Sequence, residues 1–318
     1  MRALALVPGG VEHQLAFFPI IQQISDGFEN AEISVVADPE VKEVYRLAKA
    51  VKEVVPYNFK ARNSPADWAN LLGIVRDREF EVVLTPSQSW SSGLLLWLTG
   101  IPTRIGYEGS ANNLFLTKTV PLTPNQSVAN PLAALLQGLD LTDPPPPLTI
   151  NVPQSDIAAV EALGKTAGLD GGYVLFYPGH TPSGDTYPDV GWVPILKDFQ
   201  QRQPELPLVL VQTPDTAAQV AVISQSVVGL KSIQPATTGE LAALIAGANL
   251  LIAVDSYPLD LAAALGVYAV GLFAQGQPHR PHRPEGGEDR LVSLVSVSER
   301  IADIAPTAIL KKIWTENP

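Results

Sequence analysis

Asp255 and Ser256 are the residues of this sequence best placed to act on a ligand. They follow Leu-Leu-Ile-Ala-Val (250–254), a continuous apolar run typical of a strand buried on both faces, and they precede a helical pattern at 258–265. In open α/β sheets ligands bind at this carboxyl edge, and free N–H groups at a helix start favour anions. The pattern predicts a site for a nucleotide or another phosphate-bearing ligand. The alternative is that Asp255-Ser256 is a plain helix N-cap.

A second group that could do chemistry lies at the start of the chain. A short apolar run at 3–7 is followed by Gly9, Gly10, Glu12 and His13. Either a carboxylate or an imidazole can accept a proton, and imidazole suits a base near neutral pH. The alternative is that Glu12 is an ordinary acidic residue in the first turn of a helix, with His13 solvated beside it.

Basic residues gather after the apolar run at 269–273, where the sequence reads His279-Arg-Pro-His-Arg-Pro284. This loop is predicted at the same ligand edge, where Arg280 and Arg283 would meet an anionic ligand. The prolines prevent the helical i, i+4 facing of two histidines, so we expect no metal site. A solvated proline-rich loop is the alternative.

The elements that must position these residues alternate along the chain, which predicts βαβ units and parallel sheets. A helix near 128–139 closes the first half. Predicted strands lie at 3–7, 33–37, 53–55, 82–85, 173–177, 208–211, 250–254 and 269–273. Predicted helices of the second half lie at 190–202, 214–226, 238–246 and 258–265.

Four consecutive prolines within residues 143–148 can belong to neither a helix nor a central strand. We therefore predict a first Rossmann-like domain at 1–142, a stiff linker at 143–148 and a second Rossmann-like domain at 149–300. Residues 301–318 are predicted to form a C-terminal helix.

Bulk properties narrow the class of protein. The 318 residues suffice for two domains, and 46% hydrophobic residues provide a sizeable core. A net charge of −11 argues against nucleic acid or a strongly anionic membrane as the main partner. The absence of cysteine excludes disulfides and thiolate metal sites and fits a cytoplasmic protein. No apolar run approaches the ~20 residues of a membrane span, although peripheral membrane association stays open.

Four passages together resemble a known family. They are the opening MRALALVPGG with its following helix, Arg-Ile-Gly-Tyr at 104–107, Phe-Tyr-Pro-Gly at 176–179, and the helix–strand–Asp-Ser–helix–strand segment at 238–273. In this order they resemble the glycosyltransferase family 9 heptosyltransferases. The resemblance implies an α/β GT-B fold, in which two Rossmann-like domains with parallel sheets face each other across a cleft. It also implies that the final helix crosses back to the first domain.

The resemblance further implies an activity. Such enzymes transfer a sugar, with inversion and without metal or cofactor, from a nucleotide-sugar donor to a lipopolysaccharide or glycan-type acceptor that can be lipid-linked. An ADP-sugar is the favoured donor. The first domain would hold the acceptor and the second the donor. By position, Tyr107 and Trp192 are cleft candidates. The implied site residues are Glu12 and His13 as catalytic; Gly9, Gly10 and Tyr107 on the acceptor side; and Gly179, His180, Thr181, Asp255, Ser256, Tyr257, Arg280 and Arg283 for the donor.

The sequence departs from the family pattern where the donor diphosphate would bind. Asp185 stands where the family has a lysine, Tyr257 where it has a glycine, and Asp260 where it has a histidine. Carboxylates at two of these positions repel phosphate instead of neutralising it. These changes leave a second hypothesis open: a non-catalytic GT-B descendant that acts as a binding or assembly protein.

Overall fold

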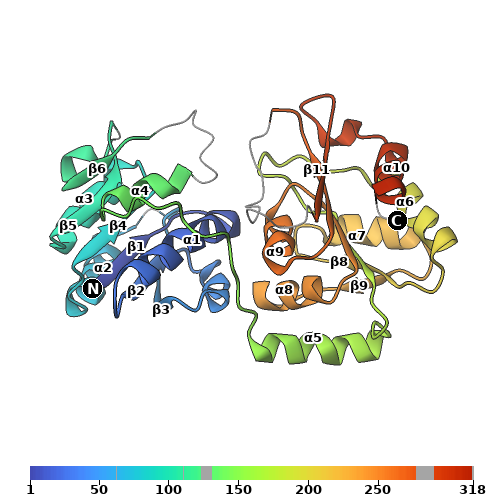
Figure 1. Cartoon of the computed structure of the whole chain (residues 1–318), viewed down its shortest axis with the longest axis horizontal. Coiled ribbons are helices and arrows are strands. Elements are labelled where there is room, and N and C mark those ends of the chain that lie inside the picture. Colours follow the sequence, from blue (N-terminus) through green and yellow to red (C-terminus); the bar gives the residue numbers. More distant parts are fainter. Residues whose placement is uncertain (62, 110, 123–130, 277–289, 317–318) are drawn as a thin grey trace. The chain divides into compact units, whose positions relative to one another are not determined.

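The computed structural model describes the whole chain except residues 62, 110, 123–130, 277–289 and 317–318. The chain divides into two compact units, Met1–Asn151 and Val152–Pro318 (Figure 1). The division comes shortly after the proline run, so the segment predicted as a linker, 143–148, belongs to the first unit.

The N-terminal unit is built on one parallel sheet. Its described strands follow the order β3-β2-β1-β4-β5-β6. The elements are β1 (Arg2–Leu6), α1 (Val11–Gly27), β2 (Glu32–Ala37), η1 (Lys42–Leu47), β3 (Val51–Pro56), α2 (Pro65–Asp77), β4 (Val82–Leu84), α3 (Trp90–Thr99), β5 (Thr103–Tyr107), η2 (Asn113–Phe115), β6 (Lys118–Val120), η3 (Pro131–Ala133) and α4 (Ala134–Gln137).

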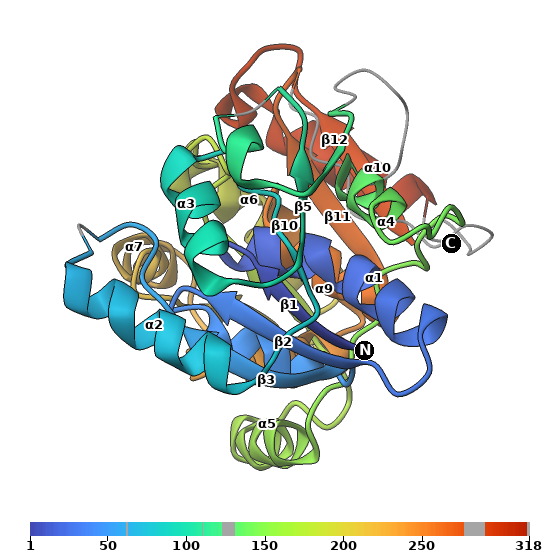
Figure 2. The same ribbon diagram turned by 90° about the vertical axis from the view of Figure 1, so that its left-hand side faces the viewer.

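Helices cover both faces of this sheet, which explains why its central strands are apolar throughout. Figure 2 shows α2 and α3 on one face and α1 on the other. On the first face, Leu4 and Val83 pair across β1 and β4 and pack with Leu71 of α2 and Leu96 of α3. The capping box of Ser64 and Asp67 starts α2, since each side chain bonds the other residue's backbone N–H.

The C-terminal unit repeats the plan. Its described strands follow the order β12-β11-β10-β7-β8-β9, again in parallel. The elements are α5 (Gln154–Ala167), β7 (Val174–Tyr177), α6 (Asp189–Arg202), β8 (Leu208–Val211), α7 (Ala217–Ser226), β9 (Lys231–Ile233), α8 (Thr238–Ala246), β10 (Leu250–Val254), α9 (Tyr257–Leu265), β11 (Ala269–Phe273), β12 (Leu291–Val295), η4 (Ile301–Asp303) and α10 (Pro306–Glu316).

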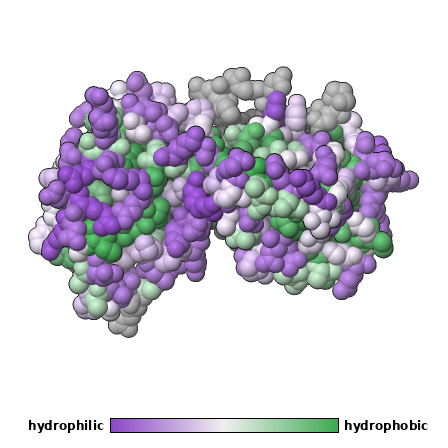
Figure 3. All heavy atoms as spheres, turned by 90° about the horizontal axis from the view of Figure 1, so that it is seen from below, coloured by the Kyte–Doolittle hydropathy of each residue, from purple (hydrophilic) through white to green (hydrophobic). Residues whose placement is uncertain are grey.

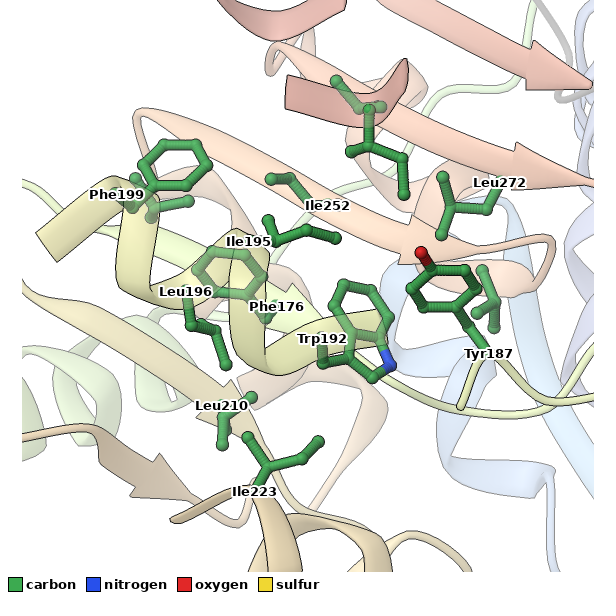
Figure 4. Packing of buried hydrophobic residues seen from close by; sticks show 14 of the residues in the cluster. Phe176, Tyr187, Trp192, Ile195, Leu196, Phe199, Leu210, Ile223, Ile252 and Leu272 are labelled. Atoms are coloured by element: carbon green, nitrogen blue, oxygen red, sulfur yellow. The ribbon is translucent and has the colours of Figure 1, made fainter. Parts of the chain in front are cut away.

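Aromatic rings fill the core between this second sheet and α6 (Figure 4). Phe176 of β7 packs edge-on against Trp192 and Phe199, with ring centroids 6.2 and 5.7 Å apart, and Tyr187 meets Trp192 at 5.2 Å. Such edge-to-face pairs stabilise a core beyond the area they bury. Trp192 has no exposed surface, so its prediction as a cleft residue was wrong.

Several elements differ from those predicted. The Arg-Ile-Gly-Tyr motif at 104–107 lies inside β5 and not after a strand. Pairing with β4 turns this short stretch, which is only partly apolar, into a strand. The helix predicted near 128–139 is represented among the described residues by only η3 and α4. Strands β6, β9 and β12 and helix α5 were not predicted.

The C-terminal helix was expected to return to the first domain, and this is corrected by the structure. Helix α10 packs on α6 within the C-terminal unit. The Trp314 ring lies 4.9 Å from that of Phe199, and its indole N–H donates to Asp198 at 2.8 Å. Ile309 and Ile313 join the same core. The apolar face of α10 is therefore buried on its own unit.

Strand order reverses at one place in each sheet. Chain connections leave β1 toward β2 on one side and return to β4 on the other; β7 and β10 have the same relation. Loops diverge at such switch points and leave room for ligands at the carboxyl ends of the strands.

Hydrophilic residues predominate on the face drawn in Figure 3, with hydrophobic ones interspersed.

The packing of α10 leads to a stability prediction. Ile313→Ala empties part of the core and should lower the free energy of unfolding by about 2–5 kcal/mol in urea titration. Lys311→Ala changes an exposed residue two positions earlier and should alter it by less than about 0.5 kcal/mol. Equal effects of the two substitutions would contradict the docking of α10 on the core.

Candidate functional site

The loop after β1 brings four predicted residues together. Gly10 is the N-cap of α1, and Glu12 and His13 lie in its first turn. Gly9 has φ of 119°, a conformation that favours glycine, and a Cβ there would lie 2.8 Å from Cγ of His13. The imidazole thus lies over Gly9 and remains exposed to solvent. Both candidate bases stand at the switch point of the first sheet.

A buried polar network that the sequence analysis missed fixes this loop. Gln14 donates to the carbonyls of Val7 at 3.2 Å and Gly9 at 3.0 Å, and it accepts from the Tyr45 hydroxyl at 2.5 Å. Burial raises the pKa of Tyr45, so it remains a neutral donor. Asp38, at the end of β2, accepts from the backbone N–H of Gly9. Gln14 is a polar residue within the apolar pattern of α1, and this was the signal in the sequence that could have revealed the network.

Tyr107, predicted on the acceptor side, ends β5 but is buried, with 3% of its surface exposed. Burial raises its pKa to about 12, so the phenol stays protonated at neutral pH. Tyr107 is thus largely enclosed by its own unit, and its role on the acceptor side stays a prediction.

In the second unit, Gly179, His180 and Thr181 do follow β7 at the switch point. The Tyr177 ring lies against Gly179, where a Cβ would overlap it. His180 is exposed, whereas Thr181 is buried and its hydroxyl accepts from the Asp185 backbone N–H at 3.0 Å. Glycine at 179 therefore makes room for an aromatic ring, and Thr181 shapes its own loop.

Asp185, which stands where the resemblance implies a lysine, has a structural role. Its carboxylate accepts from the backbone N–H of Thr186 at 3.0 Å and from that of Ile301 at 2.8 Å. Two residues later, the Tyr187 hydroxyl donates to the Ile304 carbonyl at 2.9 Å. These bonds fasten the β7–α6 loop to residues 301–304. The negative charge at this position anchors backbone instead of meeting a diphosphate.

The Asp-Ser turn lies where predicted, between β10 and α9, next to the β7 loop. Asp255 is fully buried. Ser256 is the N-cap of α9, but its hydroxyl donates to the Val254 carbonyl at 2.9 Å and does not cap the helix. Tyr257 faces Tyr177 with ring centroids 6.1 Å apart, and Asp260 is buried in the first turn. Ser256 thus has the N-cap position that the alternative predicted, but its side chain does not bond the helix.

Other features limit what the site can contain. Arg280 and Arg283 lie outside the described residues. Within the part of the chain that is described, no three His, Asp or Glu side chains gather in a way that would hold a metal ion. Among the same residues, no helix is both long and apolar enough to span a membrane.

The sequence profile of glycosyltransferase family 9 (heptosyltransferase) matches residues 68–300, well over half of the chain. The chain belongs to this family. Solved structures agree on the fold: the family 9 glycosyltransferase of Veillonella parvula superposes with a TM-score of 0.86 at 17% identity, covering 99% of this chain and 96% of that one. The predicted GT-B fold, with two Rossmann-like parallel sheets, is confirmed.

Two further relatives point in different directions. The ADP-heptose lps heptosyltransferase II of E. coli has a TM-score of 0.79 at 18% identity, with 98% of this chain and 97% of that chain covered. The photosynthetic NDH subunit of subcomplex B 1 of Arabidopsis thaliana, a chloroplastic protein, is 22% identical over 95% of this chain and 71% of its own length. This chain is therefore similar both to an enzyme and to a protein named as a subunit of a complex.

The anchoring by Asp185 can be tested directly. Asp185→Lys removes the acceptor of two backbone N–H groups and should lower the free energy of unfolding by about 1–3 kcal/mol. Asp185→Asn is the matched control, because its amide oxygen can still accept one of these bonds. Denaturant titration of both variants measures the difference. A Lys variant as stable as the parent would show that the carboxylate is dispensable.

Proposed function

We propose that this chain is an inverting, metal-independent glycosyltransferase that uses a nucleotide-sugar donor and a glycan-type acceptor. The observation that carries the proposal is the switch point of the second sheet. There Ser256 is the N-cap of α9, and its side chain does not bond the first N–H groups of the helix. Uncapped helix N-termini attract phosphate oxygens, and a departing nucleoside diphosphate is anionic.

The donor is proposed to be an ADP-sugar, in line with the name of the E. coli ADP-heptose lps heptosyltransferase II. Asp185 and Asp260 contribute no positive charge, and the Asp185 carboxylate is already bonded to backbone. Arg280 and Arg283 would then neutralise the diphosphate, with Gly179, His180 and Tyr257 bordering it. In the reaction the acceptor oxygen attacks the anomeric carbon, and the nucleotide leaves with the electron pair of the broken C–O bond.

The proton of the acceptor hydroxyl goes to Glu12 or His13. Both stand at the start of α1, and the bonded network of Gln14 and Asp38 holds the loop before them. A rigid backbone fixes the position from which the side chain of the base extends, and this helps to hold the base beside the reacting hydroxyl. A cytoplasmic location remains part of this proposal.

A second candidate function, assembly into a larger complex, is favoured by a surface of the N-terminal unit. Trp90 and Trp97 of α3 are each 55% exposed, and Leu114 of η2, which contacts α3, is 86% exposed. Spacing of seven residues puts both indoles on one side of α3, which carries no charged residue. Exposed tryptophans of this kind are common in protein interfaces. The Arabidopsis thaliana relative is named as a subunit.

The transferase proposal predicts that both arginines contribute to donor binding. Replacing Arg280 and Arg283 by Ala should weaken binding of an ADP-sugar at least about tenfold, since each charge-assisted contact is worth about 1.5–3 kcal/mol. Isothermal titration and thermal shift against ADP-, GDP-, UDP- and dTDP-sugars measure this. Arg300→Ala, outside the proposed loop, is the control. Strong donor binding that is the same in the parent and in the variant lacking both arginines would contradict this arrangement.

The assembly function makes a different prediction. Trp90→Ser with Trp97→Ser should shift the chain, in native gels of its own host, from a large complex to a small species. The reason is that two exposed indoles would lose their contact with a partner. Val222→Ser with Val228→Ser, on exposed positions of the other unit, should leave migration unchanged. Migration as a small species before any substitution would exclude stable assembly.

A further inference from the structure

A pocket of about 280 Å³ opens in the N-terminal unit, within reach of the β1–β4 switch point. Its wall comes from the loops that follow three strands, β1, β3 and β4, and from the first turns of α2 and α3. The lining residues are Pro8, Tyr57, Phe59, Ala61, Asn63, Trp68, Ser87, Ser89, Ser91, Ser92 and Leu95. Neither the candidate bases Glu12 and His13 nor the predicted donor residues are among them.

One side of the pocket is aromatic. Tyr57 and Phe59 meet nearly at right angles, with centroids 5.1 Å apart, and Trp68 of α2 completes the wall. The Phe59 backbone N–H donates to Asp38 at 2.9 Å, so the network that fixes the glycine loop also fixes this wall. Burial and the nearby Asp67 charge raise the pKa of Tyr57, which keeps its phenol neutral.

The other side presents hydroxyl groups. Ser87 donates to Ser92 at 2.9 Å, and the hydroxyls of Ser89 and Ser91 lie 2.8 Å apart. Asn112 donates to the Ser87 carbonyl at 2.5 Å and holds this segment in place. A serine hydroxyl has one donor and two acceptor positions, so each retains capacity for a ligand.

The aromatic side and the serine side of the pocket together indicate which class of ligand it binds. None of the described lining residues carries a formal charge, so a phosphate or carboxylate would be desolvated without a cationic side chain to meet it. A purely apolar ligand would instead take water away from the remaining donor and acceptor positions of the serine hydroxyls and offer no bond in exchange. An uncharged sugar avoids both costs, because its ring has a face of C–H groups for the aromatic wall and hydroxyls for the serines.

We propose that this pocket binds an uncharged sugar residue, and that the acceptor of the transfer therefore ends in a neutral sugar. The role as acceptor rests on the proposed function, whereas sugar binding does not. The pocket volume lies just below the usual range for ligand pockets, which is about 300–1,000 Å³. A pocket of this size suits one terminal sugar unit and not a long stretch of glycan.

Saturation-transfer NMR on the full chain, without nucleotide, tests the binding. The ligands are the methyl glycosides of glucose, galactose and mannose, set against glucose 6-phosphate and galacturonate. At least one neutral glycoside should bind, and more tightly than either charged sugar. Trp68→Ala should weaken that binding about tenfold, while Trp68→Phe should retain most of it, because it keeps an aromatic face.

Tyr268→Ala, which removes an exposed ring of the other unit, should leave glycoside binding unchanged. If Trp68→Ala fails to fold, Ser89→Ala with Ser91→Ala, on exposed positions, provides the same test by removing two hydroxyls. The proposal is overturned if no neutral glycoside binds at millimolar concentration, or if a charged sugar binds more tightly. If a glycoside binds but no nucleotide-sugar donor does, the proposed transferase function is refuted, whereas the proposal that the pocket binds a sugar stands.

Discussion

Burial of both faces of a parallel sheet is the constraint on which this molecule depends. Each central strand satisfies its backbone groups through its neighbours, and helices must cover the side chains above and below. Chemistry is thereby confined to the carboxyl ends of the strands, where loops diverge at a change of strand order. In this chain the candidate bases follow β1, the Asp-Ser turn follows β10, and the neutral pocket lies beyond β1, β3 and β4.

A carboxylate holds a loop beside the switch point of each sheet, but the loops that it holds differ. In the N-terminal unit, Asp38 bonds the backbone N–H groups of both Gly9 and Phe59, so the base-bearing loop and the pocket wall share one buried carboxylate. In the C-terminal unit, the Asp185 carboxylate accepts from the backbone N–H of Ile301 and holds the β7–α6 loop. The same chemistry, a carboxylate accepting backbone N–H groups, fixes a loop beside the switch point in each unit.

This difference bears on the choice between a transferase and an assembly subunit. A lysine cannot simply be restored at position 185, because the loop would lose an anchor at the same time. Loss of activity in such a variant would therefore reflect stability as well as binding. Glycoside binding, donor binding and complex formation involve separate residues, which lets each function be judged independently.

The sequence by itself determined the α/β class, the order of the principal elements and the family. Strands at 208–211, 250–254 and 269–273 and the helix at 238–246 have the predicted bounds, because apolar runs and helical periods are local signals. Only tertiary structure decided that Trp192 is core, that α10 stays on its own unit and that Asp185 reaches Ile301. Those outcomes join residues far apart in the chain, and no local pattern records which distant N–H group a carboxylate will meet.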